Sequence, residues 1–174
     1  MIVARQRTPY PLGDLLGLLD ATGHEVLVTC PGPDRLSVAW AQLVLEHGVS
    51  PPEAGAARQL RGLWGWNFGN RDASRAELAD AAIPVFATVP EREVGATGDY
   101  LATHYRRAYP SPEAGAVAWW ESMRDRWQAI EAMVSPEAFA AQLKREGYYT
   151  ASEASYAAAL RPLAAQAARM WAER

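Results

Sequence analysis

Three glutamates stand where a carboxyl group could carry out acid–base chemistry, and Glu46 is the first of them. It lies in "AWAQLVLEHG", one helical turn beyond Gln42 and in the last turn of an expected helix. The carbonyl end of a helix and apolar neighbours both disfavour negative charge, so the pKa of this carboxyl should be raised. A protonated carboxyl can donate a proton to a glycosidic oxygen. A solvated glutamate near a helix end would give the same sequence pattern.

Glu91 and Glu93, in "TVPEREVG", are candidates for a second carboxylate. An inverting glycosidase needs one across the cleft to activate water, at about 6.5–9.5 Å from the acid. Both glutamates fall in a stretch without helical periodicity, and a flexible hairpin could bring one of them over a bound substrate. Two solvent-exposed glutamates in a loop would give the same sequence pattern.

Large aromatic rings gather in two other places. Trp64 and Trp66 stand in the glycine- and asparagine-rich stretch "LRGLWGWNFGNRDAS", where their faces could stack on sugar rings or pack in the core. Tyr148 and Tyr149 stand in "GYYTASEASY", where a hydroxyl could orient an amide or donate to a developing charge, or simply pack. Residue types alone leave these alternatives open.

Composition narrows the class of protein. The 174 residues are 49% hydrophobic and 21% charged, as in an ordinary globular domain, and the net charge of −3 argues against nucleic-acid binding. The single cysteine, Cys30, excludes a disulfide framework. The three histidines show no metal-ligand spacing, and no phosphate-binding or nucleophile-elbow motif occurs. We therefore expect neither a metal nor a cofactor.

The N-terminus has none of the marks of a secretory signal, because prolines and acids interrupt its short leucine-rich part. No apolar window is long enough to cross a bilayer. We expect synthesis in the cytoplasm without a visible export signal and no stable membrane insertion.

Hydrophobic periodicity predicts one mainly α-helical domain over residues 1–174, with a small hairpin or irregular lobe. A helix over 12–22 should end at Gly23, and "HEVLVTC" reads as a brief strand. The next helix should begin near an N-cap at Asp34 and end at Gly48. Later helices should open at serine N-caps, at Ser111, Ser135 and near Ser152.

Five motifs in order carry a resemblance to a known family. They are "AWAQLVLEHG" (39–48), "WGWNFGNRD" (64–72), "EREVG" (91–95), "YRRAYPSPEAGAVAWW" (105–120) and "LKREGYYTASEASYAAAL" (143–160). Together they resemble the flagellar-type N-acetylglucosaminidase domain, a branch of the lysozyme-like peptidoglycan hydrolases. The variant found in phage and secretion-associated cell-wall enzymes is the most similar, and the resemblance covers about residues 34–165.

The resemblance implies roles for particular residues. Glu46 matches the family's general acid. The family's second acid falls on Glu93, with Glu91 as the alternative, and its tyrosine in a G-Y-x-T motif matches Tyr148. Tyr149 could take that role if the register slips by one residue.

The same resemblance makes the stretch 64–72 the floor of a glycan cleft. Gly69 and Asn70 match the family's loop glycine and asparagine, and Asn67 matches the asparagine before them. The two asparagines would either bind N-acetyl groups or tie the loop down. Trp66 would stack on glycan or pack in the core.

The implied function is hydrolysis of β-1,4 bonds in the bacterial cell-wall glycan, as an N-acetylglucosaminidase. A muramidase, a lytic transglycosylase or a non-catalytic wall-binding component of a particle on the same fold are the alternatives. The implied partners are peptidoglycan glycan strands and a phage-tail-like or secretion-machine carrier, which would deliver the protein to the wall by lysis, injection or secretion.

Overall fold

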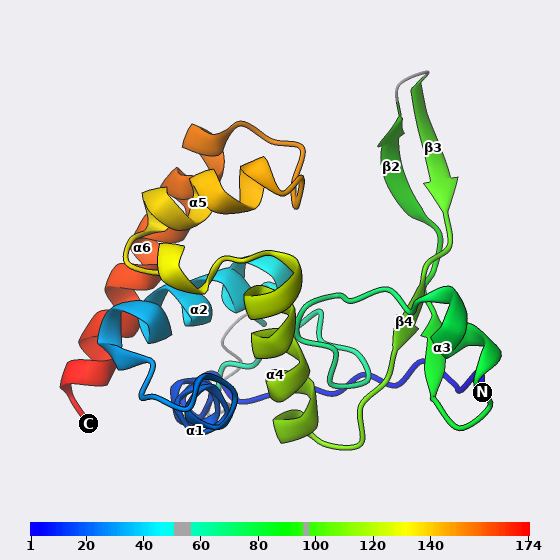
Figure 1. Ribbon diagram of the computed structural model, residues 1–174, viewed down its shortest axis with the longest axis horizontal. Coiled ribbons are helices and arrows are strands. Elements are labelled where there is room, and N and C mark those ends of the chain that lie inside the picture. Colours follow the sequence, from blue (N-terminus) through cyan, green and yellow to red (C-terminus); the bar gives the residue numbers. More distant parts are fainter. Residues whose placement is uncertain (51–56, 96–97) are drawn as a thin grey trace.

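The computed structural model describes residues 1–50, 57–95 and 98–174, without the side chains of residues 93–95. A helical body and a smaller β lobe lie side by side (Figure 1). The helices are α1 (Leu15–Leu27), α2 (Gly32–His47), α3 (Arg75–Ala79), α4 (Pro112–Glu121), α5 (Pro136–Arg145) and α6 (Glu153–Ala172). A π-helical turn (Ser122–Arg126) and a 3-10 turn (Ile130–Ala132) join α4 to α5. The predicted mainly α-helical fold with a small β lobe is confirmed.

The helical body forms around α2, which packs against α6 and α1. Leu36, Trp40 and Leu43 of α2 are fully buried, as the three- and four-residue spacing predicts. Trp119 and Trp120 bring α4 onto the same core, and their indole N–H groups donate to Gln42 Oε1 and to the Leu19 carbonyl. The end of α2 is therefore held from several sides. No helix within the described residues is long and apolar enough to span a membrane.

The first helix departs from the sequence prediction. It continues through Gly23 to Leu27, so the strand expected over "HEVLVTC" is wrong. A Cβ on Gly23 would lie 2.6 Å from Pro31 Cγ and 3.0 Å from the Trp120 ring. This glycine thus permits a close helix approach instead of ending the helix. The start of α2 is also earlier than expected, with Pro31 at the N-cap position and Asp34 in the first turn.

Serine caps begin the later helices as predicted. The hydroxyls of Ser111, Ser135 and Ser152 each accept a hydrogen bond from the backbone N–H three residues later. At α3, Ser74 and Glu77 form a reciprocal capping box, in which each side chain accepts from the other's backbone N–H. The capping box brings Glu77 to the start of its helix.

The β lobe consists of two antiparallel pairs. β1 (Val85–Ala87) pairs with β4 (Tyr105–Arg107), and β2 (Glu91–Gly95) pairs with β3 (Gly98–Ala102). The β2–β3 hairpin projects away from the rest of the lobe (Figure 1). Its register sets Glu91 opposite Ala102. Glu91 therefore stands at the base of the hairpin, nearest to β4.

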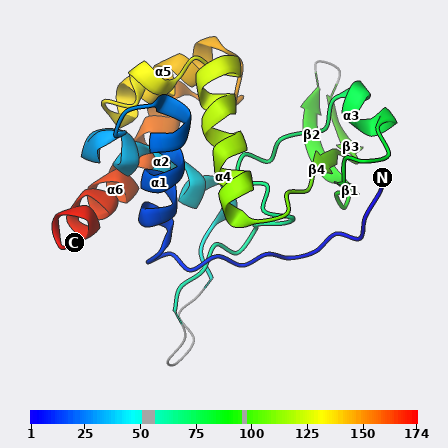
Figure 2. The same ribbon diagram turned by 60° about the horizontal axis from the view of Figure 1, so that its bottom comes forward.

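The N-terminal segment runs from α1 along the molecule to the β lobe, where the chain begins (Figure 2). Isolated bridges join Ile2 to Val85 and Arg7 to Trp64. The segment thus connects the two parts of the molecule and lies against the loop that carries the tryptophans.

Candidate active site

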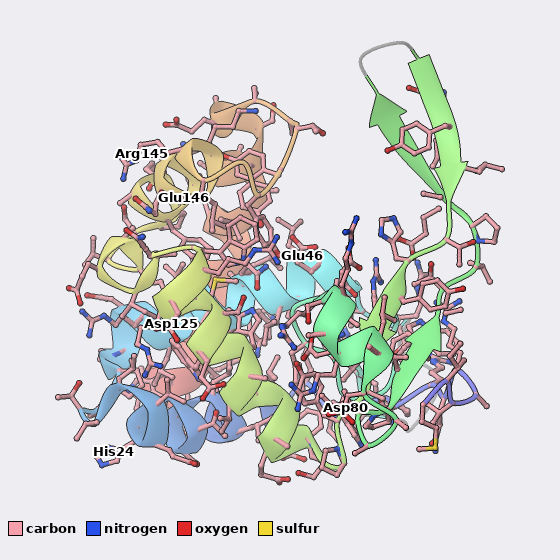
Figure 3. The ribbon with its side chains drawn as sticks, turned by 45° about the vertical axis from the view of Figure 1, so that its right-hand side comes forward. His24, Glu46, Asp80, Asp125, Arg145 and Glu146 are labelled. Atoms are coloured by element: carbon pink, nitrogen blue, oxygen red, sulfur yellow. The ribbon has the colours of Figure 1, made fainter. Side chains whose placement is uncertain are left out.

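Glu46 lies in the last turn of α2, at the end of this helix nearest the β lobe (Figure 3). Tyr156 of α6 donates a hydrogen bond from its hydroxyl to Glu46 Oε1 at 3.2 Å. One turn back, Gln42 donates from Nε2 to the Tyr148 hydroxyl at 2.7 Å and accepts from Trp119. The carboxyl thus sits in a cluster of hydroxyl and amide groups, and it forms no ion pair with any described residue.

Burial raises the pKa of the Glu46 carboxyl above its ordinary value of 4.5, against the lowering effects of Tyr156, Tyr148, the Arg106 charge and Gln42. The sequence predicted this direction, and the prediction is confirmed. Desolvation is the main cause because the neighbouring groups are neutral except for Arg106. A carboxyl in this setting holds its proton longer than a solvated one.

The two adjacent tyrosines have different surroundings. Tyr148 lies beside Glu46, and its ring packs edge-on against Trp127. Burial and the nearby Glu46 charge both raise the pKa of the Tyr148 hydroxyl. Tyr149 uses its hydroxyl to donate to the Ala140 carbonyl at 2.8 Å, and its ring stacks on Tyr156 with centroids 4.1 Å apart. Of the two, Tyr148 is therefore the neighbour of Glu46, whereas Tyr149 packs against Tyr156.

Glu91 is the β-lobe carboxylate that the structure ties to the site. Its Oε2 accepts a hydrogen bond from Arg106 at 2.8 Å, and the same guanidinium donates to Asn70 Oδ1 at 3.0 Å. The positive charge of Arg106 also lowers the pKa of the Glu46 carboxyl, so this arginine interacts with both acids. The side chain of Glu93, the other β-lobe candidate, lies outside the described residues.

The asparagines of the loop belong to its internal structure. Asn67 is only 2% exposed, and its amide donates to the carbonyls of Arg71 and Arg107 and accepts from the Arg71 N–H. Asn70 has a φ of +48° and holds Arg106 through its carbonyl oxygen. Of the two alternatives for these residues, tying the loop down is the one that their contacts support.

The glycines allow close packing of this loop. A Cβ on Gly69 would lie 3.1 Å from the Trp119 ring. Gly65 has a φ of +55°, and a Cβ there would meet the Phe86 ring at 2.9 Å. Gly69 therefore lies directly over the tryptophan that holds Gln42.

Neither tryptophan of the loop offers a free face beside Glu46. The guanidinium of Arg5 lies over the Trp64 ring, with its Cζ 3.8 Å from the ring centroid. Trp66 packs edge-on against Tyr10 and lines a cavity of about 720 Å³ with the N-terminal segment, Phe86 and Tyr109. None of the residues that line this cavity belongs to the Glu46 cluster. The recorded ring contacts of the two tryptophans are thus with Arg5 and Tyr10, and not with Tyr148 or Tyr156.

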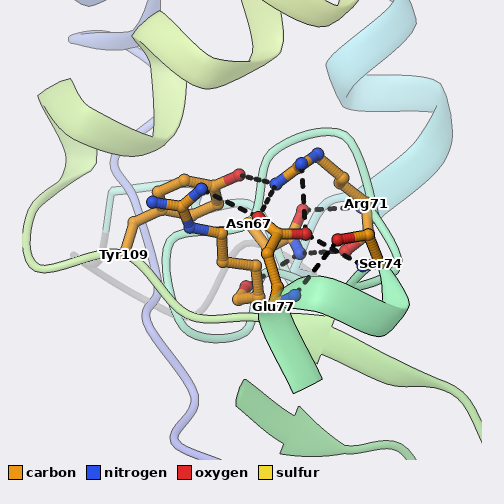
Figure 4. A network of polar contacts seen from close by, with 6 residues as sticks. Asn67, Arg71, Ser74, Glu77 and Tyr109 are labelled. Carbon is orange, nitrogen blue, oxygen red and sulfur yellow. Dashed lines mark hydrogen bonds and ion pairs between the residues drawn. The ribbon is translucent and has the colours of Figure 1, made fainter. Parts of the chain in front are cut away.

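A second polar network fixes the loop to the β lobe (Figure 4). Arg71 forms two hydrogen bonds with Glu77, and Arg107 donates to the same carboxylate at 2.9 Å. Burial alone would oppose ionisation of Glu77, but hydrogen bonds from Ser74 and Arg71 lower its pKa to about 2. This carboxylate stays ionised and acts as a structural anchor. No group of histidine, cysteine, aspartate and glutamate side chains in the described part of the chain could hold a metal ion.

Comparison of the sequence with protein-family models and with curated proteins gives no match. Comparison with solved structures gives several matches. The catalytic domain of the autolysin Auto from Listeria monocytogenes is 16% identical, with a TM-score of 0.56 over 94% of this chain and 89% of that one. A peptidoglycan hydrolase mutant from Sphingomonas sp. A1 is 17% identical, with a TM-score of 0.54 over 91% and 99%. The glycoside hydrolase domain of FlgJ from Salmonella typhimurium is 18% identical, with a TM-score of 0.53 over 94% and 92%.

The chain has the fold of these hydrolase domains. The resemblance predicted from the five sequence motifs is confirmed at this level, and the match covers nearly all of each compared chain. This fold places Tyr148 beside Glu46, and Arg106, whose charge acts on Glu46, forms a hydrogen bond with Glu91 at the base of β2.

Two residues of this region were missed by sequence reasoning. Tyr156 was not among the candidates, because an apolar ring on a helix facing the core is usually a packing residue, yet its hydroxyl reaches Glu46. Arg106 precedes Arg107 in a strand, and nothing in a pair of arginines indicates which one pairs with Glu91. The available signal was strand alternation: neighbouring side chains point to opposite faces, so the two arginines should not both face Glu91.

Proposed function

We propose that this protein is a glycoside hydrolase of bacterial peptidoglycan that cleaves β-1,4 bonds with Glu46 as the general acid. The observation that carries the proposal is the raised pKa of Glu46 within a cluster of hydroxyl and amide groups at the end of α2. The fold supports it, because the solved structures that share it include two described as peptidoglycan hydrolase or glycoside hydrolase.

In the proposed reaction Glu46 protonates the oxygen of the leaving sugar. Tyr156 holds the carboxyl by its Oε1, and the carboxyl proton passes to the leaving oxygen of the substrate. As the bond breaks, positive charge develops on the sugar ring, and a carboxylate on the opposite side stabilises it. Glu91 is our choice for that carboxylate, because Arg106 holds it at the base of the hairpin next to the loop.

The acetamido group of the substrate offers a second route to the same stabilisation. The Tyr148 hydroxyl accepts from Gln42 and lies against the Glu46 carboxyl, and in this route its O–H would turn from Glu46 to the amide carbonyl of the bound substrate. Under this route Glu91→Gln would retain most of the activity and Tyr148→Phe would lose it. Glu93→Gln provides the comparison for the other β-lobe candidate.

Specificity for the bond after N-acetylglucosamine is part of the proposal, and so is delivery by a phage-tail-like or secretion-machine carrier. Both rest on the motif resemblance. The substrate-binding roles of Trp64 and Trp66 receive no support from their packing, and neither does that of Tyr149.

The test is digestion of insoluble peptidoglycan by the purified wild type and by Glu46→Gln, with soluble fragments identified by mass spectrometry. Glu25→Gln is the matched control, because Glu25 is an exposed glutamate on α1. We expect fragments with N-acetylglucosamine at the reducing end from the wild type and the control, and none from Glu46→Gln. Reducing-end muramic acid would make the protein a muramidase, and an anhydro end a transglycosylase. If the wild type binds the wall but releases nothing, the protein is a binding component and the proposal fails.

A further inference from the structure

A cavity of about 490 Å³ lies where the end of α4 faces the loop and the β lobe. Glu121 of α4 and Arg126 of the π-helical turn line it on one side, and Arg71, Ser74 and Arg107 line it on the other. Its volume is that of an ordinary ligand site. No aromatic residue of the described chain lines it, so it offers no ring face on which a sugar could stack.

Two charged side chains of this cavity have no ion-pair partner among the described residues. They are Glu121 and Arg126, and both are exposed. The remaining charged residues of the lining all have partners: Arg71 and Arg107 bond to Glu77, Asp72 pairs with His104, and Asp125 pairs with Arg124. The cavity therefore presents one cation and one anion that a ligand can bind.

Arg126 is held in place by an aromatic ring that leads to the proposed acid. Its Cζ lies 4.4 Å from the centroid of the Trp127 ring, and that centroid is 4.9 Å from the centroid of the Tyr148 ring. The Tyr148 hydroxyl lies 2.7 Å from Nε2 of Gln42, one helical turn before Glu46. A guanidinium stacked on a ring keeps its N–H groups in the plane of the fork, where a carboxylate can receive two of them.

A second set of contacts joins the cavity to the same glutamine. The cavity shares Arg71 and Ser122 with a small hollow that Trp119 also lines. The indole N–H of Trp119 donates to Gln42 Oε1 at 3.1 Å. Two routes of side-chain contact thus connect the cavity to the turn of α2 that carries Glu46.

Arg124 shows what the π-helical turn does differently at Arg126. It stands two positions earlier, pairs with Asp125, and donates to the Val26 carbonyl at 3.0 Å. It lines another cavity, which α1 residues also line. Residues two apart in a helical turn do not share a face, and π-helical turns often occur at functional sites. The turn therefore directs a paired arginine toward α1 and an unpaired one toward the β lobe.

We propose that this cavity binds the peptide stem of peptidoglycan, with Arg126 receiving a carboxylate and Glu121 the ammonium group of the diamino acid. The inference rests on the proposed function. N-acetylglucosamine is neutral, whereas a stem carries both carboxylates and an ammonium group, which matches the two unpaired charges. A peptide spans at most about 3.3–3.6 Å per residue, so a stem of four residues extends about 14 Å from its sugar. A glycan bound at Glu46 can therefore place its stem in the cavity.

The test compares Arg126→Gln with Arg124→Gln, its matched control in the same turn, and Glu121→Gln with Glu113→Gln. Glu113 is an exposed glutamate of α4 that does not line the cavity. All four changes are made in the Glu46→Gln protein, so that binding is measured without cleavage. Isothermal titration uses three probes: a tetrasaccharide of alternating N-acetylglucosamine and N-acetylmuramic acid that bears stems, the same compound with the stem amine acetylated, and the stem-free glycan as its lactyl amide.

We expect the stem-bearing probe to bind more tightly than the stem-free one. Arg126→Gln should weaken binding of both stem-bearing probes about three- to tenfold, the range for a charge-assisted bond that is partly solvated. Glu121→Gln should weaken binding of the free-amine probe only. The two control variants should bind all three probes as the parent does. Arg126→Lys should restore part of the affinity, and added salt should reduce the differences.

An equal loss for the stem-free probe would show that Arg126 only supports Trp127, and the stem site would be overturned. Equal affinities of Arg126→Gln and Arg124→Gln for the stem-bearing probe would also overturn it. Cleavage of peptidoglycan by the protein with native Glu46 tests the function separately. If cleavage is present and stems add no affinity, only the stem site is lost. Absence of both cleavage and binding overturns the function and the stem site together.

Discussion

Glu46 and Glu77 both lie at helix ends and are shielded from solvent, but their surroundings shift their pKa values in opposite directions. Glu46 stands in the last turn of α2 among tyrosine and glutamine side chains, and burial raises its pKa. Glu77 stands in the first turn of α3, where hydrogen bonds from Ser74 and Arg71 lower its pKa to about 2 despite burial. Desolvation acts in the same direction on both carboxyls. The hydrogen bonds and charges around each one decide the outcome.

The difference separates chemistry from architecture. Asp and Glu are favoured at helix starts and disfavoured at helix ends, so α3 stabilises its carboxylate and α2 does not. When a protein raises the pKa of one carboxyl and lowers that of another, the first can donate a proton at the working pH and the second remains charged. We interpret Glu46 as the proton donor and Glu77 as the anchor that holds the loop against the β lobe.

The largest expected effect is on activity at Glu46. Glu46→Gln should lower the rate of peptidoglycan cleavage by about 10²–10⁴-fold, because the amide cannot donate the proton. The rate of release of soluble fragments measures this. Activity within a factor of a few of the wild type would remove Glu46 from the mechanism.

The same variant should gain stability at neutral pH. A folded-state pKa above the unfolded value of 4.5 means that ionising Glu46 costs folding free energy as the pH rises through and beyond 4.5. Glu46→Gln removes that cost, so its free energy of unfolding at pH 7 should exceed that of the wild type by an amount on the order of 1 kcal/mol, with a correspondingly higher thermal midpoint. Below pH 4 the two proteins should converge. A lower midpoint at pH 7 would contradict the assigned surroundings.

Glu77→Gln should have the opposite consequence. The change leaves Arg71 and Arg107 without their shared carboxylate, and we expect a loss of about 2–4 kcal/mol in the free energy of unfolding, measured with urea. Because the folded pKa is depressed, the Glu77 contribution is present above about pH 4.5 and is lost as the pH falls toward 2. The variant should therefore lose less stability than the wild type over that range. Equal acid sensitivity of the two proteins would remove Glu77 as the anchor.

Asn67→Ala should destabilise the protein by about 1–3 kcal/mol, since three backbone groups lose their partner. Asn70→Ala is the comparison and should cost less, because among the described residues the half-buried Asn70 side chain bonds to Arg106 alone. If Asn67→Ala left stability unchanged and weakened glycan binding instead, the loop asparagine would be a ligand-binding group.

Tyr156→Phe should give the smallest effect. Its hydroxyl lowers the pKa of Glu46, so removing the hydroxyl raises that pKa further and moves the alkaline limb of the pH–rate profile to higher pH. The rate at the optimum should fall about two- to tenfold, the worth of one hydrogen bond. Tyr149→Phe is the control, because its hydroxyl bonds to Ala140 and not to Glu46. A downward shift of the alkaline limb in Tyr156→Phe would contradict the contact.

The helices of the fold could be predicted from the sequence because local chemistry determines them. Serine caps and the glycine after His47 set their boundaries, and hydrophobic spacing identified α2 and α6. Local rules failed at Gly23, where the absence of a side chain serves packing against Trp120 across the body and not helix termination. Such a contact joins residues far apart in the chain, and a local pattern carries no information about it.

The candidate site, too, could be predicted from the sequence only in part. The helix end at Gly48 and the apolar neighbours of Glu46 were enough to predict the direction of its pKa shift. The partners of the loop could not be predicted, because Asn67 is satisfied by backbone groups and Trp64 is covered by an arginine from the N-terminal segment. Tyr156 and Arg106 become visible only once α6 and β4 are placed beside α2 and β2.

The fold raises the pKa of Glu46 and lowers that of Glu77, and the assignment of Glu46 as the acid depends on that difference. The most direct measurement is a pH titration of the protein labelled with ¹³C at glutamate carboxyls, followed by NMR, with Glu46→Gln and Glu77→Gln used to assign the two resonances. We predict that the Glu46 resonance titrates with a midpoint above 4.5, while the Glu77 resonance remains that of a carboxylate down to the lowest pH at which the protein stays folded. A Glu46 midpoint at or below 4.5 would contradict the account.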